Sequence, residues 1–163
     1  MKALKYTLFL SIAMIIACTK PPDYSDTPEI AFISLSKTSM VAADDLSDNL
    51  TLTISFTDGD GDIGIDGGTP SVYFKDLRDG SEFITFVAPV IPEQGVGNGI
   101  SGEMYIKVST TCCIHPIDIS SGCQSDFSDF PVDSLIYEVY IIDRSGNKSN
   151  VIQTDPIVLL CEN

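Results

Sequence analysis

The chain has 163 residues, of which 23 are acidic and nine are basic, and its net charge is −14. This length fits a single domain. Such an acidic surface repels nucleic acid and anionic lipid headgroups, so nucleic acid is excluded as a partner. The charge balance suits an extracytoplasmic domain and cation binding, but it identifies neither.

The first 17 residues have the layout of a secretory signal. Lys2 and Lys5 give a positively charged start, and residues 8–17 are almost entirely apolar. This apolar run is shorter than the roughly 20 residues that a membrane span needs. We therefore predict that residues 1–17 are a signal peptide that is removed on export.

The end of this segment, Ile15-Ile16-Ala17-Cys18, resembles a lipobox, the bacterial lipoprotein signal. The resemblance implies cleavage before Cys18, a diacylglycerol on its thiol and an acyl chain on its new amine. Position 15 is more often Leu in that family, and the alternative is an ordinary signal peptide with a chance cysteine. Several acyl chains give stable anchoring where one does not. Thr19 in place of Asp implies the outer membrane, on its periplasmic or cell-surface face.

The rest of the chain divides into a tether and a domain. Residues 18–28 are predicted to be the lipidated cysteine and a flexible, proline-containing tether, and residues 29–163 a single domain. Residues 50–57 alternate apolar side chains with Thr and Ser, which indicates a half-buried strand. Similar short runs predict seven strands in all, at residues 29–36, 50–57, 71–75, 82–90, 104–108, 134–142 and 151–160.

Seven short strands with no amphipathic helix after the signal predict an all-β fold. Turn residues between the strands favour an immunoglobulin-like or fibronectin-III-like antiparallel β-sandwich. Asp143 and the following residues to Asn147 form a turn signal between the last two strands, in which Gly146 is free to take a positive φ. Pro156 lies within the last predicted strand, which fits an edge position better than a central one.

Four cysteines follow the proposed lipidation site: Cys112, Cys113, Cys123 and Cys161. An even number in an exported chain predicts two disulfides. A bridge between the adjacent Cys112 and Cys113 would be strained, so one of them pairs with Cys123 and the other with Cys161. Both pairings remain open. A four-thiolate zinc site is the alternative, but the spacing lacks two C-x-x-C halves.

The segment Thr57-Asp-Gly-Asp-Gly-Asp-Ile-Gly-Ile-Asp66 is the most informative motif. Asp58, Asp60 and Asp62 alternate with glycines, and Asp66 follows. Calcium prefers oxygen ligands, and carboxylates at alternate positions can converge on one ion while the glycines allow tight bending. The alternative is a solvated acidic turn, because Asp-Gly runs are common in plain loops.

The motif is not an EF-hand, because Ile63 stands where that loop needs Gly and Thr69 stands where it needs a bidentate Glu. In the predicted sandwich, the aspartate loop and the turn that begins at Asp143 lie at the same end. We therefore predict that the calcium ligands come from both segments: Asp58, Asp60, Asp62, Asp66 and Asp143.

Three segments together resemble a group of lipoproteins from Bacteroidetes-type bacteria for which no activity is established. They are the Asp58–Gly64 run, the Cys-Cys loop and residues 137–147, Tyr-Glu-Val-Tyr-Ile-Ile-Asp-Arg-Ser-Gly-Asn. The resemblance covers most of the chain after the signal, and its motifs are specific as a set but weak singly. It implies an outer-membrane or surface lipoprotein with an Ig-like domain.

We expect no enzymatic activity and no catalytic residues. His115 is the single histidine, no Gly-x-Ser-x-Gly elbow is present, and a chain without Trp offers little platform for a glycosidase substrate. Two functions from different classes remain. The first is a binding or adhesion module for an envelope protein or a glycan, ordered by calcium. The second is a structural subunit of an outer-membrane or surface complex without a ligand of its own.

A partner surface has one candidate in the sequence. Three tyrosines, Tyr73, Tyr105 and Tyr140, lie in predicted strands. An exposed aromatic patch marks a protein-binding surface, so their alignment on one sheet face would favour a protein partner.

Overall fold

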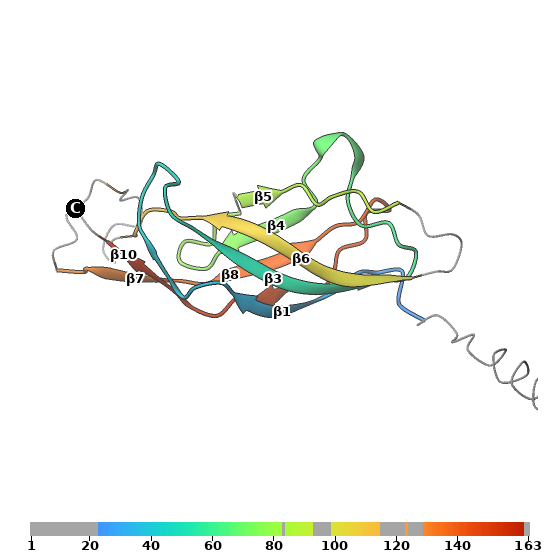
Figure 1. Cartoon of the computed structure of the whole chain (residues 1–163), viewed down its shortest axis with the longest axis horizontal. Helices are drawn as coiled ribbons and strands as arrows, with labels where there is room; N and C mark the ends of the chain where they lie inside the picture. The colour runs from blue at the N-terminus through green and yellow to red at the C-terminus, as the bar shows by residue number, and fades with distance from the viewer. Residues whose placement is uncertain (1–22, 83, 93–98, 115–122, 124–128, 162–163) are drawn as a thin grey trace, which may run out of the picture.

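The computed structural model describes residues 23–82, 84–92, 99–114, 123 and 129–161 (Figure 1). Within these residues the chain forms ten β-strands and one short 3-10 helix, with no α-helix. The all-β prediction is therefore confirmed. The predicted signal peptide, the lipidation site Cys18, the first part of the tether and His115 lie outside the described residues.

The longest sheet is antiparallel and has the order β1-β3-β6. It contains β1 (Glu29–Leu35), β3 (Asn49–Asp58) and β6 (Ile100–Ser109). β3 and β6 pair over their full length, from Asn49 opposite Ser109 to Asp58 opposite Ile100. The alternation in β3 turns its apolar side chains into the core, as the period of two predicts.

A second antiparallel sheet has the order β5-β4-β8-β9. Its strands are β5 (Ile84–Phe86), β4 (Val72–Asp76), β8 (Tyr137–Ile141) and β9 (Ile152–Gln153). β4 and β8 form its centre, with Val72 opposite Ile141.

The third sheet has the order β2-β10-β7 and lies at the opposite end of the molecule from the start of the described chain (Figure 1). It contains β2 (Ser39–Val41), β10 (Ile157–Leu160) and β7 (Val132–Leu135). β10 runs antiparallel to β7 and parallel to β2. The sequence analysis did not predict β2.

Two predicted strands are each divided between two sheets, so the prediction of seven strands was wrong. The predicted strand 134–142 breaks at Ile136, whose carbonyl accepts a hydrogen bond from the Leu77 N–H at 3.1 Å. The predicted strand 151–160 breaks before Pro156, which has no N–H for a ladder. The predicted strand 82–90 is shorter, since β5 covers Ile84–Phe86 alone.

All three sheets contribute side chains to one hydrophobic core. Phe74 of β4 packs against Tyr137 of β8, edge to face, with ring centroids 5.5 Å apart. Leu52 of β3 and Leu159 of β10 are completely buried in the same core. Burial of apolar surface is the main favourable term in folding, so the three sheets stabilise one another through this core.

Two disulfides lie at the end that holds β7 and β10: Cys112–Cys123 and Cys113–Cys161. This is one of the two pairings that the sequence left open. The Cα atoms of Cys113 and Cys161 are 5.9 Å apart, and both residues are buried. The second bridge therefore attaches the C-terminal strand β10 to the loop that follows β6.

Arg78 connects several segments at this end, and the sequence analysis did not single it out. Its guanidinium donates hydrogen bonds to Asp76 at 2.6 Å, to Asp133 at 2.7 Å and to the Cys112 carbonyl at 3.1 Å. Burial raises the pKa of Asp133, but hydrogen bonds from the Ile114 N–H and from Arg78 outweigh this effect and hold it below its usual value. The Arg78 side chain, in the turn between β4 and β5, thus connects that turn to β7 and to the loop that follows β6.

We expect the two disulfides to contribute unequally to stability. Cys113–Cys161 spans 48 residues and Cys112–Cys123 spans 11. In the chain-entropy model, closing the longer loop stabilises the fold by about 4 kcal/mol and closing the shorter one by about 3 kcal/mol. Urea unfolding of the Cys113→Ala/Cys161→Ala and Cys112→Ala/Cys123→Ala variants measures both losses. A smaller loss for the longer bridge would contradict this ranking.

Candidate metal centre

Four aspartate carboxylates converge at the end of the molecule opposite the disulfides. β3 ends at Asp58, and the Gly-Asp-Gly-Asp loop that follows carries Asp60 and Asp62. Asp143 comes from the turn between β8 and β9, where the Arg144 N–H donates to the Asp62 carbonyl at 3.2 Å. Ligand oxygens of all four aspartates lie within 4.8 Å of one another. We call these four residues the aspartate cluster.

Three of the four carboxylates are buried. Asp58 is 0 % exposed, Asp143 is 1 % exposed and Asp62 is 8 % exposed, whereas Asp60 faces solvent. Removing charged carboxylates from water costs free energy, and placing like charges side by side adds repulsion. An arrangement of this kind needs compensation from hydrogen-bond donors or from a cation.

Hydrogen bonds within the described chain compensate the cluster only in part. Asp58 Oδ2 accepts a bond from the Asp62 N–H at 2.8 Å, and Asp62 Oδ2 accepts bonds from the N–H and hydroxyl of Ser145 at 2.9 and 2.8 Å. The second oxygen of each carboxylate, Oδ1 of Asp58 and Oδ1 of Asp62, is buried without a hydrogen-bond partner. Buried polar atoms in folded proteins almost always have a partner, which can be an ordered water, so these two oxygens are positions that a metal ion or a water could occupy.

Asp143 is held by its own turn. Its Oδ1 accepts from the Asn147 N–H at 2.7 Å and its Oδ2 from the Asn147 side-chain amide at 2.9 Å. Gly146 has a φ of 89°, the positive value that the sequence analysis expected of this turn. The turn therefore fixes the Asp143 carboxylate beside the aspartate loop before any ligand is bound.

Arg144, which follows Asp143 in the chain, does not neutralise the cluster. The Arg144 guanidinium donates to backbone carbonyls of Ile63, Gly64 and Ile91 at 3.1–3.4 Å. The ion pairs found among the described residues do not include any carboxylate of the cluster. Arg144 thus holds the backbone of the aspartate loop in place, and no ion pair among the described residues offsets the negative charge of the cluster.

The pKa values reflect this uncompensated charge. Burial, and to a smaller extent the charges of the other cluster aspartates, raise the pKa of Asp58 from 3.8 to about 6, against the opposing hydrogen bond from the Asp62 N–H. Burial and the neighbouring charges, those of Asp62 and Asp143 foremost, also raise the pKa of Asp60. Both carboxylic acids therefore hold their protons more tightly than ordinary aspartates do.

Asp66 was predicted as a ligand but lies outside the cluster. It begins the short 3-10 helix η1 (Asp66–Gly68) and is exposed. After Asp62 the chain turns away from the cluster, because Ile63 is buried in the core. Gly64 then packs on the backbone of Pro89, so closely that an added Cβ would lie 2.3 Å from the Pro89 carbonyl oxygen. Core packing therefore separates Asp66 from the three aspartates that precede it.

The chain between residues 23 and 28 contacts the aspartate loop, which the sequence analysis did not expect of a flexible tether. The Gly59 N–H donates to the Ser25 carbonyl at 2.7 Å, and the Asn147 side chain donates to the Asp26 carbonyl at 3.3 Å. A Cβ on Gly59 would lie 2.4 Å from the Tyr24 carbonyl oxygen. Glycine at position 59 is thus required for this close approach.

The donor set of the cluster fits a hard divalent cation. All four side chains supply carboxylate oxygens, and neither sulfur nor imidazole nitrogen is among them. Calcium takes six to eight oxygens in flexible geometry, from carboxylates, backbone carbonyls and water. The two orphaned oxygens are already buried, so binding a cation there would not require their desolvation.

No protein-family model matches the chain, and neither does any curated protein or solved structure. Among the residues that the structure describes, no helix is long and apolar enough to cross a membrane. The two disulfides favour an extracytoplasmic location, because such bridges form and persist in oxidising compartments.

The three tyrosines of the sequence analysis do not share one sheet. Tyr73 of β4 and Tyr140 of β8 stack with ring centroids 5.0 Å apart, and the Lys148 ammonium lies 3.6 Å from the centre of the Tyr140 ring. Tyr105 belongs to β6 of the other long sheet and is exposed. The Tyr73–Tyr140 pair and the Tyr105 ring therefore do not form one aromatic patch on a single sheet face.

In the presence of a chelator, we expect Asp58 to make the stability of the fold depend on pH. Its pKa in the folded chain is about 6 and its ordinary value is 3.8, so the folded state binds the proton more strongly between these values. The contribution of Asp58 to the unfolding free energy is therefore full below pH 3.8 and falls as the pH rises through about 6.

Urea unfolding of the wild type and the Asp58→Asn variant at several pH values isolates this effect, since asparagine does not titrate. The wild type should lose stability relative to the variant as the pH rises through this range. A difference that does not change with pH would show that Asp58 titrates normally.

Proposed function

We propose that the aspartate cluster binds one calcium ion. The observation that carries this proposal is the pair of buried carboxylate oxygens, on Asp58 and Asp62, that have no hydrogen-bond partner. A divalent cation would satisfy both oxygens and remove the repulsion within the cluster. The exposed carboxylate of Asp60 leaves the site open to water, which would complete the coordination shell.

We further propose that the chain is an exported lipoprotein anchored through Cys18 at the outer membrane. The signal-like start, the lipobox resemblance and the two disulfides support this proposal. Tyr24, which packs against the aspartate loop, follows Cys18 by six residues. An anchored chain would thus carry its calcium site at the end from which the tether leaves the domain.

An Ig-like sandwich is the architecture that we propose for the domain. β1, β3 and β6 form one sheet, whereas β4, β8 and β9 lie in another. In chain order these are the first, second and fifth predicted strands and the third, sixth and seventh. This division is like that of an Ig-like fold, although the fourth predicted strand, β5, joins the second sheet and not the first. The shared core supports the same arrangement.

Within this architecture we propose a binding module for an envelope protein, with calcium ordering the loops at one end. Exposed side chains at β6 support a protein partner: Tyr105 is 68 % exposed, and Val87, which lines a groove together with it, is also exposed. An exposed apolar patch on a small domain is typical of a protein-binding surface.

Calcium should stabilise the folded chain in a saturable way. A ligand that binds only the folded state adds about 2.7 kcal/mol to the unfolding free energy at 100 times its dissociation constant. We expect the melting temperature to rise with calcium and the rise to disappear in an Asp60→Asn/Asp62→Asn variant. Differential scanning fluorimetry with and without a chelator measures both.

Asp66→Asn is the control, since it removes one carboxylate charge from the segment that follows the loop, outside the cluster. It should keep the full calcium response. An equal loss of response in this variant, or no response of the wild type to millimolar calcium, would show that the cluster is a solvated acidic turn.

The anchor is tested separately from the cation. Cells that express the full chain should incorporate labelled palmitate into it and retain it in the membrane fraction, whereas a Cys18→Ala variant should remain unlabelled and be released. Cys18 is chosen because the lipobox resemblance ends there. Equal labelling of the two chains would reject lipidation at this residue.

A further inference from the structure

β6 has one edge that no other described strand covers. It lies at the end of the sheet order β1-β3-β6 and pairs with β3 alone. With ten residues it is as long as β3, whereas the strands at the edges of the second sheet, β5 and β9, have three and two residues. A long open edge is a template for pairing with another strand.

The residues whose backbone groups face this edge follow from the register. The Thr110 N–H donates to the Asp48 carbonyl, which continues the β3–β6 ladder by one pair. Even-numbered residues therefore point their N–H and C=O groups toward β3, and odd-numbered residues point theirs toward the open edge. The odd-numbered residues of β6 are Ser101, Glu103, Tyr105, Lys107 and Ser109.

Four of these five residues have exposed side chains and Ser109 is half-buried, and the order of the five is self-complementary. Tyr105 stands in the centre, Glu103 and Lys107 lie two residues away on either side, and Ser101 and Ser109 lie two residues further out. We propose that two copies of the chain pair through β6 in antiparallel orientation, with Tyr105 on the twofold axis. Glu103 of each copy then lies opposite Lys107 of the other, and serine lies opposite serine.

The charges select this register over its neighbours. Centring the pair on Glu103 places two carboxylates opposite each other, and centring it on Lys107 places two ammonium groups opposite each other. Centring it on Met104 or Ile106 leaves each charge opposite an uncharged side chain. Opposite charges on facing strands attract and like charges repel, so the register centred on Tyr105 is the one that the side chains favour.

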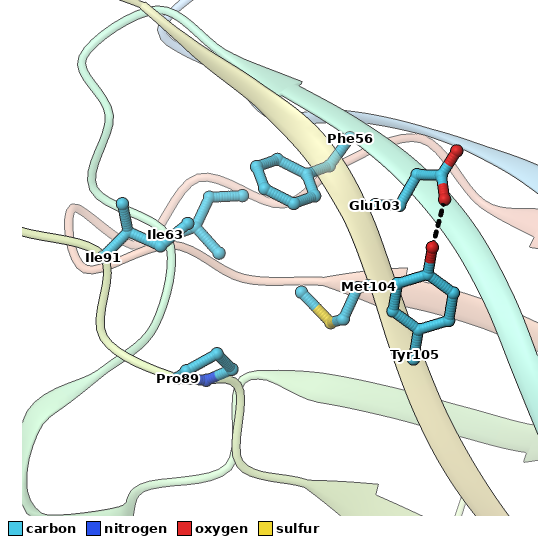
Figure 2. Close-up of a pocket in the computed structure, with 7 residues that line it drawn as sticks. All are labelled: Phe56, Ile63, Pro89, Ile91, Glu103, Met104 and Tyr105. Carbon is cyan, nitrogen blue, oxygen red and sulfur yellow. Dashed lines mark hydrogen bonds between the residues drawn. The ribbon is translucent and has the colours of Figure 1, made fainter.

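An apolar groove runs along the core side of the same edge. Figure 2 shows Met104 pointing toward Ile63 and Pro89, while Tyr105 and Glu103 lie on the other side of β6 and share a hydrogen bond of 2.5 Å. Phe56 and Ile91 complete this lining. A second strand on the edge would cover this groove and bury the exposed Tyr105 ring against its symmetry mate.

A lysine on an edge strand can also protect the strand from pairing. Glu103 argues for pairing, because it lies two residues before Tyr105 and Lys107 lies two residues after it. Protection of an edge would need charges of one sign only, and a carboxylate placed symmetrically to the lysine is not required for it. A twofold pairing is closed, so it yields a dimer rather than a fibre. The dimer does not depend on the proposed calcium site, which lies at the end of β3.

Sedimentation equilibrium of the full chain, carrying Cys18→Ser to keep it free of lipid, tests the proposal over a range of protein concentrations. The wild-type chain should form dimers. Lys107→Glu and Glu103→Lys should each weaken the dimer about tenfold or more, because each replaces two attractive cross-strand pairs with two repulsive ones. Both side chains are exposed, so the melting temperature of the monomer should not change.

Two further experiments, in which opposite charges face each other again, make the test specific to the proposed register. The double variant Glu103→Lys/Lys107→Glu should dimerise like the wild type, and an equimolar mixture of the two single variants should form a mixed dimer. Lys75→Glu, which makes the same charge change on β4, should leave dimerisation unaffected. Failure of the double variant to dimerise would overturn the register. If the wild-type chain stays monomeric, the proposed dimer is wrong. The open edge of β6 would then be a site for an extended segment of another protein.

Discussion

Three carboxylates, those of Asp58, Asp62 and Asp143, are buried against one another without a basic partner among the described residues, and this constraint organises one whole end of the fold. Burial of like charges is tolerated only where donors or cations compensate it. The backbone of Asp62, both donors of Ser145 and both donors of Asn147 supply part of this compensation. The turn after β8 donates hydrogen bonds to the loop after β3, from Ser145 to the Asp62 carboxylate and from the Arg144 N–H to the Asp62 carbonyl. These bonds hold the two segments together.

At the opposite end of the molecule, carboxylate charges are compensated by a basic side chain of the chain itself. There, Arg78 lies between Asp76 and Asp133 and donates to both, and the hydrogen bonds that Asp133 receives hold its pKa below its usual value. At the cluster, by contrast, the pKa of Asp58 is raised. Arg144, which follows Asp143 in the chain, donates to backbone carbonyls instead of carboxylates. This contrast supports the proposal that the aspartate cluster binds a cation from outside the chain.

Periodicity and turn chemistry in the sequence account for the all-β fold and for the approach of Asp143 to the aspartate loop. They do not show which sheet a strand joins, so the breaks at Ile136 and before Pro156 could not be foreseen from alternation alone. Asp66 was assigned to the cluster because spacing along a flexible loop does not reveal that Ile63 enters the core. Contacts between distant segments, such as Ser25 with Gly59, leave no local pattern in the sequence.

The proposed dimer places its two aspartate clusters far apart. In a register centred on Tyr105, Ile100 of one copy lies opposite Thr110 of the other, so the end of β3 that carries Asp58 in one copy lies beside the disulfide end of the other. The two tethers would then leave from opposite ends of the joined sheet. Both can reach one membrane if the strands lie along its surface with the twofold axis perpendicular to it. If the chain is anchored as proposed, the hydrogen bond from the Gly59 N–H to the Ser25 carbonyl would set the point from which each tether turns toward that surface. Order at the cluster and orientation of the dimer would then be linked.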